Sequence, residues 1–343
     1  MRTTFLLIML SSVIRLNAQE RVQEFAWSYP ADRFQELTIL NRLGNVDVRQ
    51  GGDLFEIKAE VRIKAKSGEK VDEIMEYLKI DAIERPTILH VSSVLEKNLT
   101  FKKLFCGVSV YVDYRVKIPK GKKLSVANKD GSVIIGNFTG DLNVEVVTGD
   151  FKARQIEGDF TAKLTDGLFE VQDVNRFTGD FQSATVKIIS GSRLKLNSDG
   201  SKIDVGKAEE IIAKCAGGTL NVNSVDEINL AAAGAKCEIQ DVSESFRGDL
   251  RSSRLVVRSI NHFFSSVDIA ATNTNIALHF RPGGGFNMNL KHDNIKIALP
   301  AHFALETKPT MNRKVFIESG FIGDKQFNSQ VSLNVTGGKV SID

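Results

Sequence analysis

The sequence contains a repeat that strongly limits the folds open to this chain. Gly131, Gly149 and Gly167 are evenly spaced, each number being the previous one plus 18, and the positions between them keep their apolar or polar character from one repeat to the next. The matched apolar positions are Val133, Phe151 and Phe169; Phe138, Ile156 and Val174; and Leu142 and Phe160. A fixed period of about 18 residues with strand-like alternation is typical of a β-solenoid. We therefore expect stacked coils.

Glycine–aspartate pairs mark the predicted corners of these coils. They occur at Gly140-Asp141, Gly149-Asp150, Gly158-Asp159 and Gly179-Asp180. Glycine can take a positive φ at a corner, and an aspartate side chain can accept a hydrogen bond from its own downstream amide. Corners at every ninth position predict two short opposed sheets per coil. The wider interval from Gly167 to Gly191 predicts one longer coil, because these numbers differ by 24, with a loop at residues 175–179.

The start of the chain has the features of an export signal. Residues 1–18 contain Arg2, an apolar stretch and a small residue, Ala18, before Gln19, which together predict a secretory signal peptide. An uncleaved N-terminal anchor is the alternative, although the apolar stretch of about ten residues is shorter than the ~20 needed to span a bilayer. We expect no transmembrane segment once the signal is removed.

Three further segments are predicted after the signal. Residues 19–118 form an N-terminal β-rich domain with one amphipathic helix over 69–79, where apolar residues recur at helical spacing. Pro119 cannot donate to a strand ladder, so residues 119–285 begin a new unit, the β-solenoid repeats. Residues 286–343 form irregular coils and a cap, and residues 331–342 end it as a closing hairpin or last coil. The expected fold class is all-β: an N-terminal β-layer with one amphipathic helix that leads into a parallel β-solenoid, with two-sheet coils of about 18–24 residues.

Charge and cysteine content exclude several classes of protein. The chain has 45 basic and 42 acidic residues, and loss of Arg2 and Arg15 with the signal leaves a net charge of +1. This balance gives no reason to expect nucleic acid as a partner. Cys106, Cys215 and Cys237 are too few for a disulfide framework and are expected to be buried thiols, with a Cys215–Cys237 bridge as the alternative.

No residue pattern points to catalysis or metal binding. His279, His292 and His302 are spread through the irregular C-terminal part without ligand spacing, and the glycines at 283–285 lack the lysine of a phosphate-binding loop. Corner aspartates such as Asp141 and Asp159 could bind calcium or serve a glycosidase, but turn geometry already accounts for them. We therefore predict no catalytic residues, no cofactor-binding residues, no metal site and no cofactor.

Outward charges are expected to pair between coils. The predicted neighbours are Lys152 with Glu170 and Glu145 with Lys163. With such pairing, opposite charges would lie beside one another on successive coils and face solvent. It gives no basic patch for a partner.

Several short motifs together resemble one family. They are Leu37-x-Ile39 followed by Gly44-x-Val46-x-Val48, Ile118-Pro119-Lys120-Gly121, and the repeated Asp-Gly-Ser-Val and Thr-Gly-Asp-Phe turns. Over most of residues 36–343 the chain resembles the bacterial putative-adhesin domains, exported all-β solenoid proteins common in Bacteroidetes-type bacteria. The resemblance implies an architecture, and that family supplies no catalytic residues.

The expected function is that of a non-enzymatic exported envelope protein, an adhesin or a scaffold with a binding surface. Its partner could be a glycan, an envelope protein or a second copy, in the periplasm, at the outer membrane or outside the cell. The alternative is a β-helix carbohydrate-active enzyme, a polysaccharide lyase or glycosidase, which would need carboxylates clustered in a groove on one face. If a binding site exists, the irregular coils and the loop at residues 281–285 are the expected place.

Overall fold

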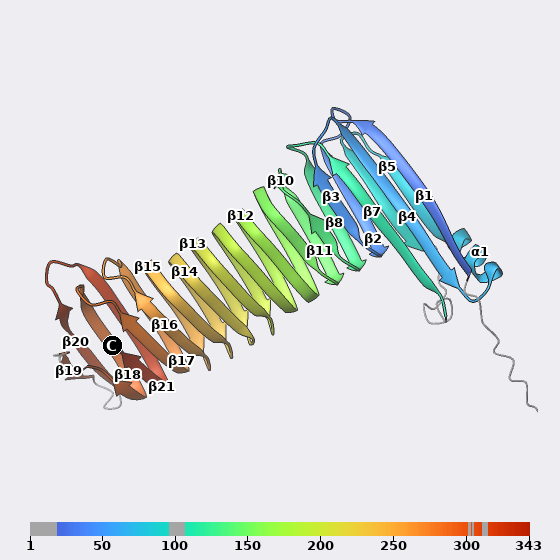
Figure 1. Cartoon of the computed structure of the whole chain (residues 1–343). Coiled ribbons are helices and arrows are strands. Elements are labelled where there is room, and N and C mark those ends of the chain that lie inside the picture. The colour runs from blue at the N-terminus through green and yellow to red at the C-terminus, as the bar shows by residue number, and fades with distance from the viewer. Residues whose placement is uncertain (1–18, 96–106, 301–302, 304, 311–314) are drawn as a thin grey trace, which may run out of the picture.

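The computed structural model describes residues 19–95, 107–300, 303, 305–310 and 315–343. Within these ranges the protein is all-β with one helix, and its strands form one long mixed sheet that extends from the N-terminal to the C-terminal end (Figure 1). Cys106 and His302 lie outside the described residues. No helix in the described ranges is long and apolar enough to cross a membrane.

The single described helix, α1 (Gly68–Tyr77), confirms the helix expected over 69–79. It buries Val71 and Ile74 and contacts three strands, β1 (Gln19–Pro30), β4 (Leu54–Ala65) and β5 (Leu78–Glu84). The helix ends where Leu78 becomes extended and begins β5. It therefore packs its apolar stripe on the N-terminal strands, as an amphipathic helix does.

Two ladders of paired strands begin at the N-terminal end. The first ladder runs β1, β4, β7 (Ser109–Ile118), β3 (Val46–Gln50) and β9 (Val133–Ile135). The second ladder runs β5, β6 (Ile88–Leu95), β2 (Glu36–Leu43), β8 (Lys123–Asp130) and β11 (Leu142–Thr148). The outermost pairs are antiparallel, and pairing becomes parallel from β7–β3 and β6–β2 inward. Strands on both sides of Pro119 therefore share one sheet.

The middle of the chain consists of long strands in parallel register. They are β12 (Phe151–Asp199), β13 (Lys202–Ala216), β14 (Thr219–Ala233) and β15 (Lys236–Arg251), with the short β10 (Phe138–Thr139) paired to β12. Paired residue numbers differ by 18 between β11 and β12 and by 17 between β13 and β14, as in Leu142↔Phe160 and Ile203↔Leu220. Each of these segments therefore pairs in register with the segment 17 or 18 residues further along the chain.

Backbone angles locate the corners. Positive φ angles occur at Gly131, Gly140, Gly149, Gly158 and Gly167, at every ninth position as expected. Positive φ angles then recur at Asp166, Ser183, Gly200, Gly217, Gly234 and Ser252, at intervals of 17 or 18.

The expected longer coil and its loop at 175–179 are wrong. No residue from 175 to 179 has a positive φ, Phe177 among them is buried, and the corner falls at Ser183. The error has a physical cause: a serine with φ of 52° occupies the corner where a glycine was expected, so glycine spacing misplaces it. Gly191 has no positive φ and is not a corner.

Corner aspartates bond between turns, whereas bonds to their own downstream amides were expected. Asp141 Oδ1 accepts a hydrogen bond from the amide of Asp159 at 3.3 Å, and Asp150 Oδ1 accepts one from Leu168 at 3.1 Å. Each carboxylate therefore reaches an amide one repeat later and ties one turn to the next.

The core and the outer face largely follow the predicted alternation. Phe151, Phe160, Phe169, Phe177 and Phe181 are buried, with neighbouring ring centroids 4.9–6.1 Å apart. The pair Glu145–Lys163 is confirmed at 3.8 Å.

Two details of side-chain pairing complete this picture. Glu170 pairs with Lys187 at 3.4 Å, where Lys152 was expected. Cys215 and Cys237 are free, buried thiols, as predicted.

The C-terminal end departs from the predicted order. Residues 331–342 belong to β21 (Ser329–Ile342), expected as a closing hairpin or last coil, and β21 lies between β17 (Ser266–Phe280) and β18 (Gly285–Ala298) in parallel register. Beyond β18 lie the antiparallel β20 (Val315–Gly323) and β19 (Glu306–Pro309). β16 (Arg254–Ile260) pairs with β17 on the other side. The chain therefore turns back and inserts its last described strand between β17 and β18, with β18, β20 and β19 lying outside it.

Candidate binding site

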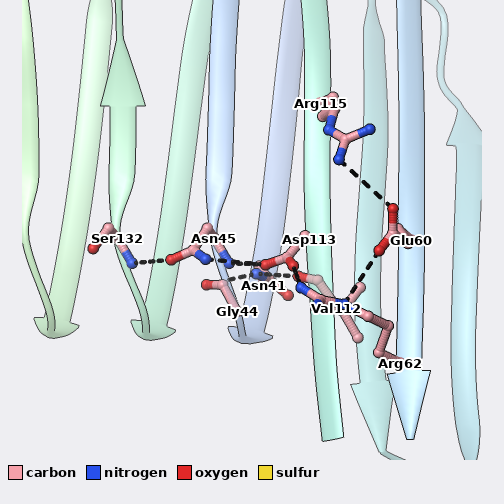
Figure 2. Close-up of polar contacts among 9 residues, drawn as sticks. All are labelled: Asn41, Gly44, Asn45, Glu60, Arg62, Val112, Asp113, Arg115 and Ser132. Carbon is pink, nitrogen blue, oxygen red and sulfur yellow. Dashed lines mark hydrogen bonds and ion pairs between the residues drawn. The ribbon is translucent and has the colours of Figure 1, made fainter. Parts of the chain in front are cut away.

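The densest polar cluster of the N-terminal end lies around Asn45 (Figure 2). The amide of Asn45 donates to Asp113 Oδ1 at 2.8 Å, and its Oδ1 accepts from the amide of Ser132 at 2.9 Å. Arg62 bonds Asp113 and pairs with Glu60 at 3.2 Å. The hydrogen bond to Asp113 raises the pKa of Arg62. These contacts join β4, β7 and the starts of β3 and β9, so the cluster has a structural role.

Two buried asparagines complete this polar region. Asn41 Nδ2 donates to the carbonyls of Gly44 and Val112, and Asn41 Oδ1 accepts from Ser93 Oγ at 2.6 Å. Asn128, its partner in the next strand, donates to the carbonyls of Gly44 and Gly131. The amides therefore satisfy corner carbonyls that would otherwise be buried without a partner.

The structure does not bring His279 and His292 together, whereas Asp141 and Asp159 are neighbours on adjacent turns. His279 Nδ1 contacts Asp343, whereas His292 Nε2 contacts Glu318 at 3.3 Å. Asp141 Oδ1 accepts a hydrogen bond from the amide of Asp159. In the described ranges, no three histidine, cysteine or acidic side chains are placed to hold a metal ion.

One outer corner carries carboxylates on successive turns. Glu209 and Asp226 are neighbours in register, and Glu244 follows across the irregularity in the β14–β15 register. Glu209 Oε1 accepts a hydrogen bond from Ser192 Oγ at 3.3 Å, so one carboxylate of this column is bonded to the preceding turn. The column is an exposed acidic ridge.

An apolar pocket lies where the C-terminal strands change order. It has a volume of about 370 Å³, and loop residues 281–284 cover one side of it. Its walls are Ile260, Phe264, Phe280, Phe286, Phe303 and Ile322. The phenyl rings contact one another, with Phe280 stacked on Phe286 at 4.6 Å and Phe264 5.4 Å from Phe280. The loop expected as the better place for a site therefore borders a pocket of the size that small ligands occupy.

The inserted strand explains why there is a pocket here. Phe280 ends β17, and the next strand along the chain, β18, pairs with β21 and not with β17. Residues 281–284 therefore cross the position of β21 before β18 begins. The crossing chain is held close by glycines: a Cβ on Gly284 would lie 2.9 Å from His262 Cβ, and a Cβ on Gly323 2.1 Å from the Gly284 oxygen.

The polar groups of the pocket lie at its mouth. Arg281 bonds Asp241 at 2.6 Å and Ser259 at 2.7 Å, so its charge is paired away from the cavity. The Asp343 side chain is 62% exposed and His262 is half-buried, and both line the pocket. The charged groups of the described lining are therefore open to solvent.

An exposed aromatic rim adjoins the pocket. Phe263 is 72% exposed, the highest value among the large exposed hydrophobic residues of the described chain, whereas the adjacent Phe264 is 3% exposed and faces the pocket. Phe263 packs against His262 and Phe327, with ring centroids 4.1 and 5.6 Å away. Phe264 also lines the shallow hollow between Phe263 and Phe327, so pocket and rim share a wall.

Sequence reasoning named the loop but missed the phenylalanines. The available signal was the pair Phe263-Phe264 outside the repeat, followed by Phe280, Phe286 and Phe303. Their meeting depends on the position of β21, which the sequence pattern did not predict.

Comparisons with known proteins identify no relative by sequence. No family model matches the chain, and no curated protein matches it. Among solved structures, a "putative lipid binding protein" from Parabacteroides distasonis shares 11% identity, with 95% of this chain and 98% of that chain covered and a TM-score of 0.36. A "putative adhesin" from the same organism shares 10% identity over 94% and 97% of the two chains, with a TM-score of 0.35.

A third solved structure has the same kind of name. A "putative adhesin" from Parabacteroides merdae shares 13% identity over 74% of this chain and 92% of that one, with a TM-score of 0.33. Likeness at this level identifies neither a family nor a ligand for this chain.

Proposed function

We propose that this chain is a non-enzymatic binding protein of the cell envelope that holds its ligand at the C-terminal end. The observation that carries the proposal is the exposed ring of Phe263, packed against the half-buried Phe327, beside the apolar pocket. An exposed aromatic group costs solubility, and contiguous exposed apolar surface is typical of binding sites. The described outer faces of the middle strands carry charges paired between turns, as in Glu145–Lys163, and their exposed large hydrophobic residues, Ile134, Val147, Ile189 and Ile212, are each less exposed than Phe263.

In this proposal the middle of the chain is a stiff spacer. Residues 119–285 form a parallel β-solenoid with two short sheets per coil, residues 19–118 form the N-terminal domain, and residues 286–343 form the cap. The parallel register from β11 to β14, with paired residue numbers offset by 17 or 18, and the corners at matched intervals support the solenoid part of this proposal. A spacer of this kind sets the binding end apart from the N-terminal end.

Export follows from the sequence. Residues 1–18 have the pattern of a cleaved secretory signal. The mature protein then works in the periplasm, at the outer membrane or outside the cell.

The enzyme alternative has weaker support. Its best location is the acidic ridge of Glu209, Asp226 and Glu244, which ends beside the aromatic corner because the carbonyl of Glu244 accepts hydrogen bonds from the amide and Oγ of Ser265. Sugar-cleaving sites place carboxylates on both sides of a bound sugar. The ridge is a single column, so its carboxylates lie on one side only.

The test is retention of residues 19–343 on an envelope extract, with released sugar measured in the same samples. We expect retention without sugar release, and a large loss of retention in Phe263→Ser. Tyr111→Ser is the matched control, because Tyr111 is 51% exposed and belongs to β7 at the N-terminal end. Equal retention of both variants would contradict binding at the C-terminal end, and sugar release would favour the enzyme.

A further inference from the structure

We propose that the pocket under residues 281–284 binds the apolar chain of an amphiphile, such as the acyl chain of a lipid, with the polar head left in water. This inference rests on the proposed function and names the ligand class of the same site. Three observations carry it: the chemistry of the walls, the position of the polar groups and the continuity of pocket and rim.

The described walls are mostly apolar. They consist of four phenyl rings, the side chains of Ile260 and Ile322, and the loop at residues 281–284, and His262, Arg281 and Asp343 are the ionisable residues of this lining. Among the described residues, the buried polar side-chain atoms without a hydrogen-bond partner belong to Arg62, Tyr114 and Asn128, and none of them lines this pocket. A sugar or peptide placed here would lose its hydrogen bonds to water without replacement, which is costly. An alkyl chain loses none and gains about 0.8 kcal/mol per buried CH₂.

The mouth suits a polar head in solvent. Arg281, His262 and Asp343 stand there, and the Arg281 guanidinium is already paired with Asp241. The mouth therefore presents both signs of charge to water. No buried charge selects a particular head group, so the chain of the ligand is the recognised part.

The rim extends the apolar path out of the pocket. Phe264 has one side in the pocket and another in the hollow between Phe263 and Phe327. A chain longer than the cavity can therefore continue over exposed aromatic surface. This continuity gives the exposed Phe263 a role that packing within the protein does not supply.

The chain's single tryptophan makes a sharp test possible. Trp27 lies on β1 at the N-terminal end, far along the stack from β17 and β18 (Figure 1). The variant Phe263→Trp places an indole on the rim, outside the pocket walls. The probe is cis-parinaric acid, a fatty acid whose conjugated chain accepts excitation energy from nearby tryptophan.

We expect saturable quenching of indole emission in Phe263→Trp, with one probe bound per protein and reversal by both hexadecanoic acid and hexadecanol. Reversal by the alcohol separates recognition of the chain from recognition of a carboxylate. The wild-type protein and Tyr111→Trp, whose indoles lie at the N-terminal end, should show little transfer. Equal transfer at both ends, or no saturable quenching in Phe263→Trp, would overturn the proposal.

A second variant locates the probe inside the pocket. Ile322→Phe, combined with Phe263→Trp, fills part of the cavity and should weaken probe binding at least tenfold. Unchanged affinity in a folded double variant would mean that the probe lies only on the rim, which would also overturn the proposal. If Ile322→Phe does not fold, Ile260→Phe, at the other aliphatic wall residue of the same pocket, is measured in its place, with the same expected loss.

The two claims fail separately. Retention on envelope extract without parinaric acid binding would remove the acyl-chain assignment and leave the proposed function in place. Binding of parinaric acid without retention would do the reverse.

Discussion

The carbonyl oxygen of Gly131 lies directly against Cα of Gly149, so that a Cβ added to Gly149 would lie 2.2 Å from that oxygen. Gly167 has the same relation to Gly149, at 1.9 Å. The three glycines therefore stack with no room for side chains. Their even spacing in the sequence is the direct result of this contact between turns.

The glycine stack predicts a large effect of a single methyl group. Gly149→Ala should lower the free energy of unfolding by at least about 2 kcal/mol, because alanine at φ of 141° is strained and its Cβ meets backbone that cannot move aside. Chemical denaturation measures the change. Gly136→Ala is the control, since Gly136 has no positive φ and no atom within 4 Å of an added Cβ. Equal stability of the two variants would contradict the stack.

The corner at Ser183 predicts a stabilising substitution. Ser183 has φ of 52°, a left-handed conformation that costs a residue with a Cβ roughly 1 kcal/mol and costs glycine little. Ser183→Gly should therefore raise stability by a few tenths of a kcal/mol to about 1 kcal/mol, whereas Ser183→Val should lower it. A decrease with glycine larger than the decrease with valine would show that the corner is elsewhere.

The buried amide of Asn128 predicts a loss larger than its size suggests. Asn128→Ala removes donors to the carbonyls of Gly44 and Gly131, and it should cost about 1–3 kcal/mol because the Gly44 acceptor is buried and the Gly131 acceptor is partly buried. Thermal unfolding compares it with Asn143→Ala, where the side chain is exposed and the change should stay within about 0.5 kcal/mol. Similar melting temperatures for the two variants would contradict the role of the amide.

The buried thiols predict a pH dependence in alkali. Burial, and then the nearby Cys215, raise the pKa of Cys237 to about 12. A raised pKa favours the folded state below the unfolded value near 9, and the unfolded state gains as pH rises from there toward 12. Stability of the wild type should therefore fall above pH 9 more steeply than that of Cys237→Ala, by up to about 1.4 kcal/mol per pH unit. Parallel curves from pH 8 to 11 would contradict a protonated buried thiol.

The sequence predicted the repetitive features well because each is a local requirement. A turn with no space for a Cβ needs glycine, so Gly131, Gly149 and Gly167 reveal the period. Inward phenylalanines follow from strand alternation, and the helix from apolar spacing at the helical period. These signals depend only on neighbours along the chain or one turn away.

The features that the sequence did not predict depend on contacts without a local signature. Ser183 forms a corner without a glycine, so the spacing of glycines predicted the wrong corner position there. β21 pairs between β17 and β18, and nothing in its own alternation says which strands flank it. The pocket follows from that insertion. The sequence therefore predicted the loop that borders the candidate site but not the phenylalanines that form its walls.

The most direct test of the central claim is hydrogen exchange of the full mature protein with and without envelope extract. The account predicts added protection at residues 260–265, 281–286 and 324–329, with the middle strands β13 to β15 unchanged. Protection spread along the outer faces of those middle strands, with none at the C-terminal corner, would contradict binding through the end of the stack.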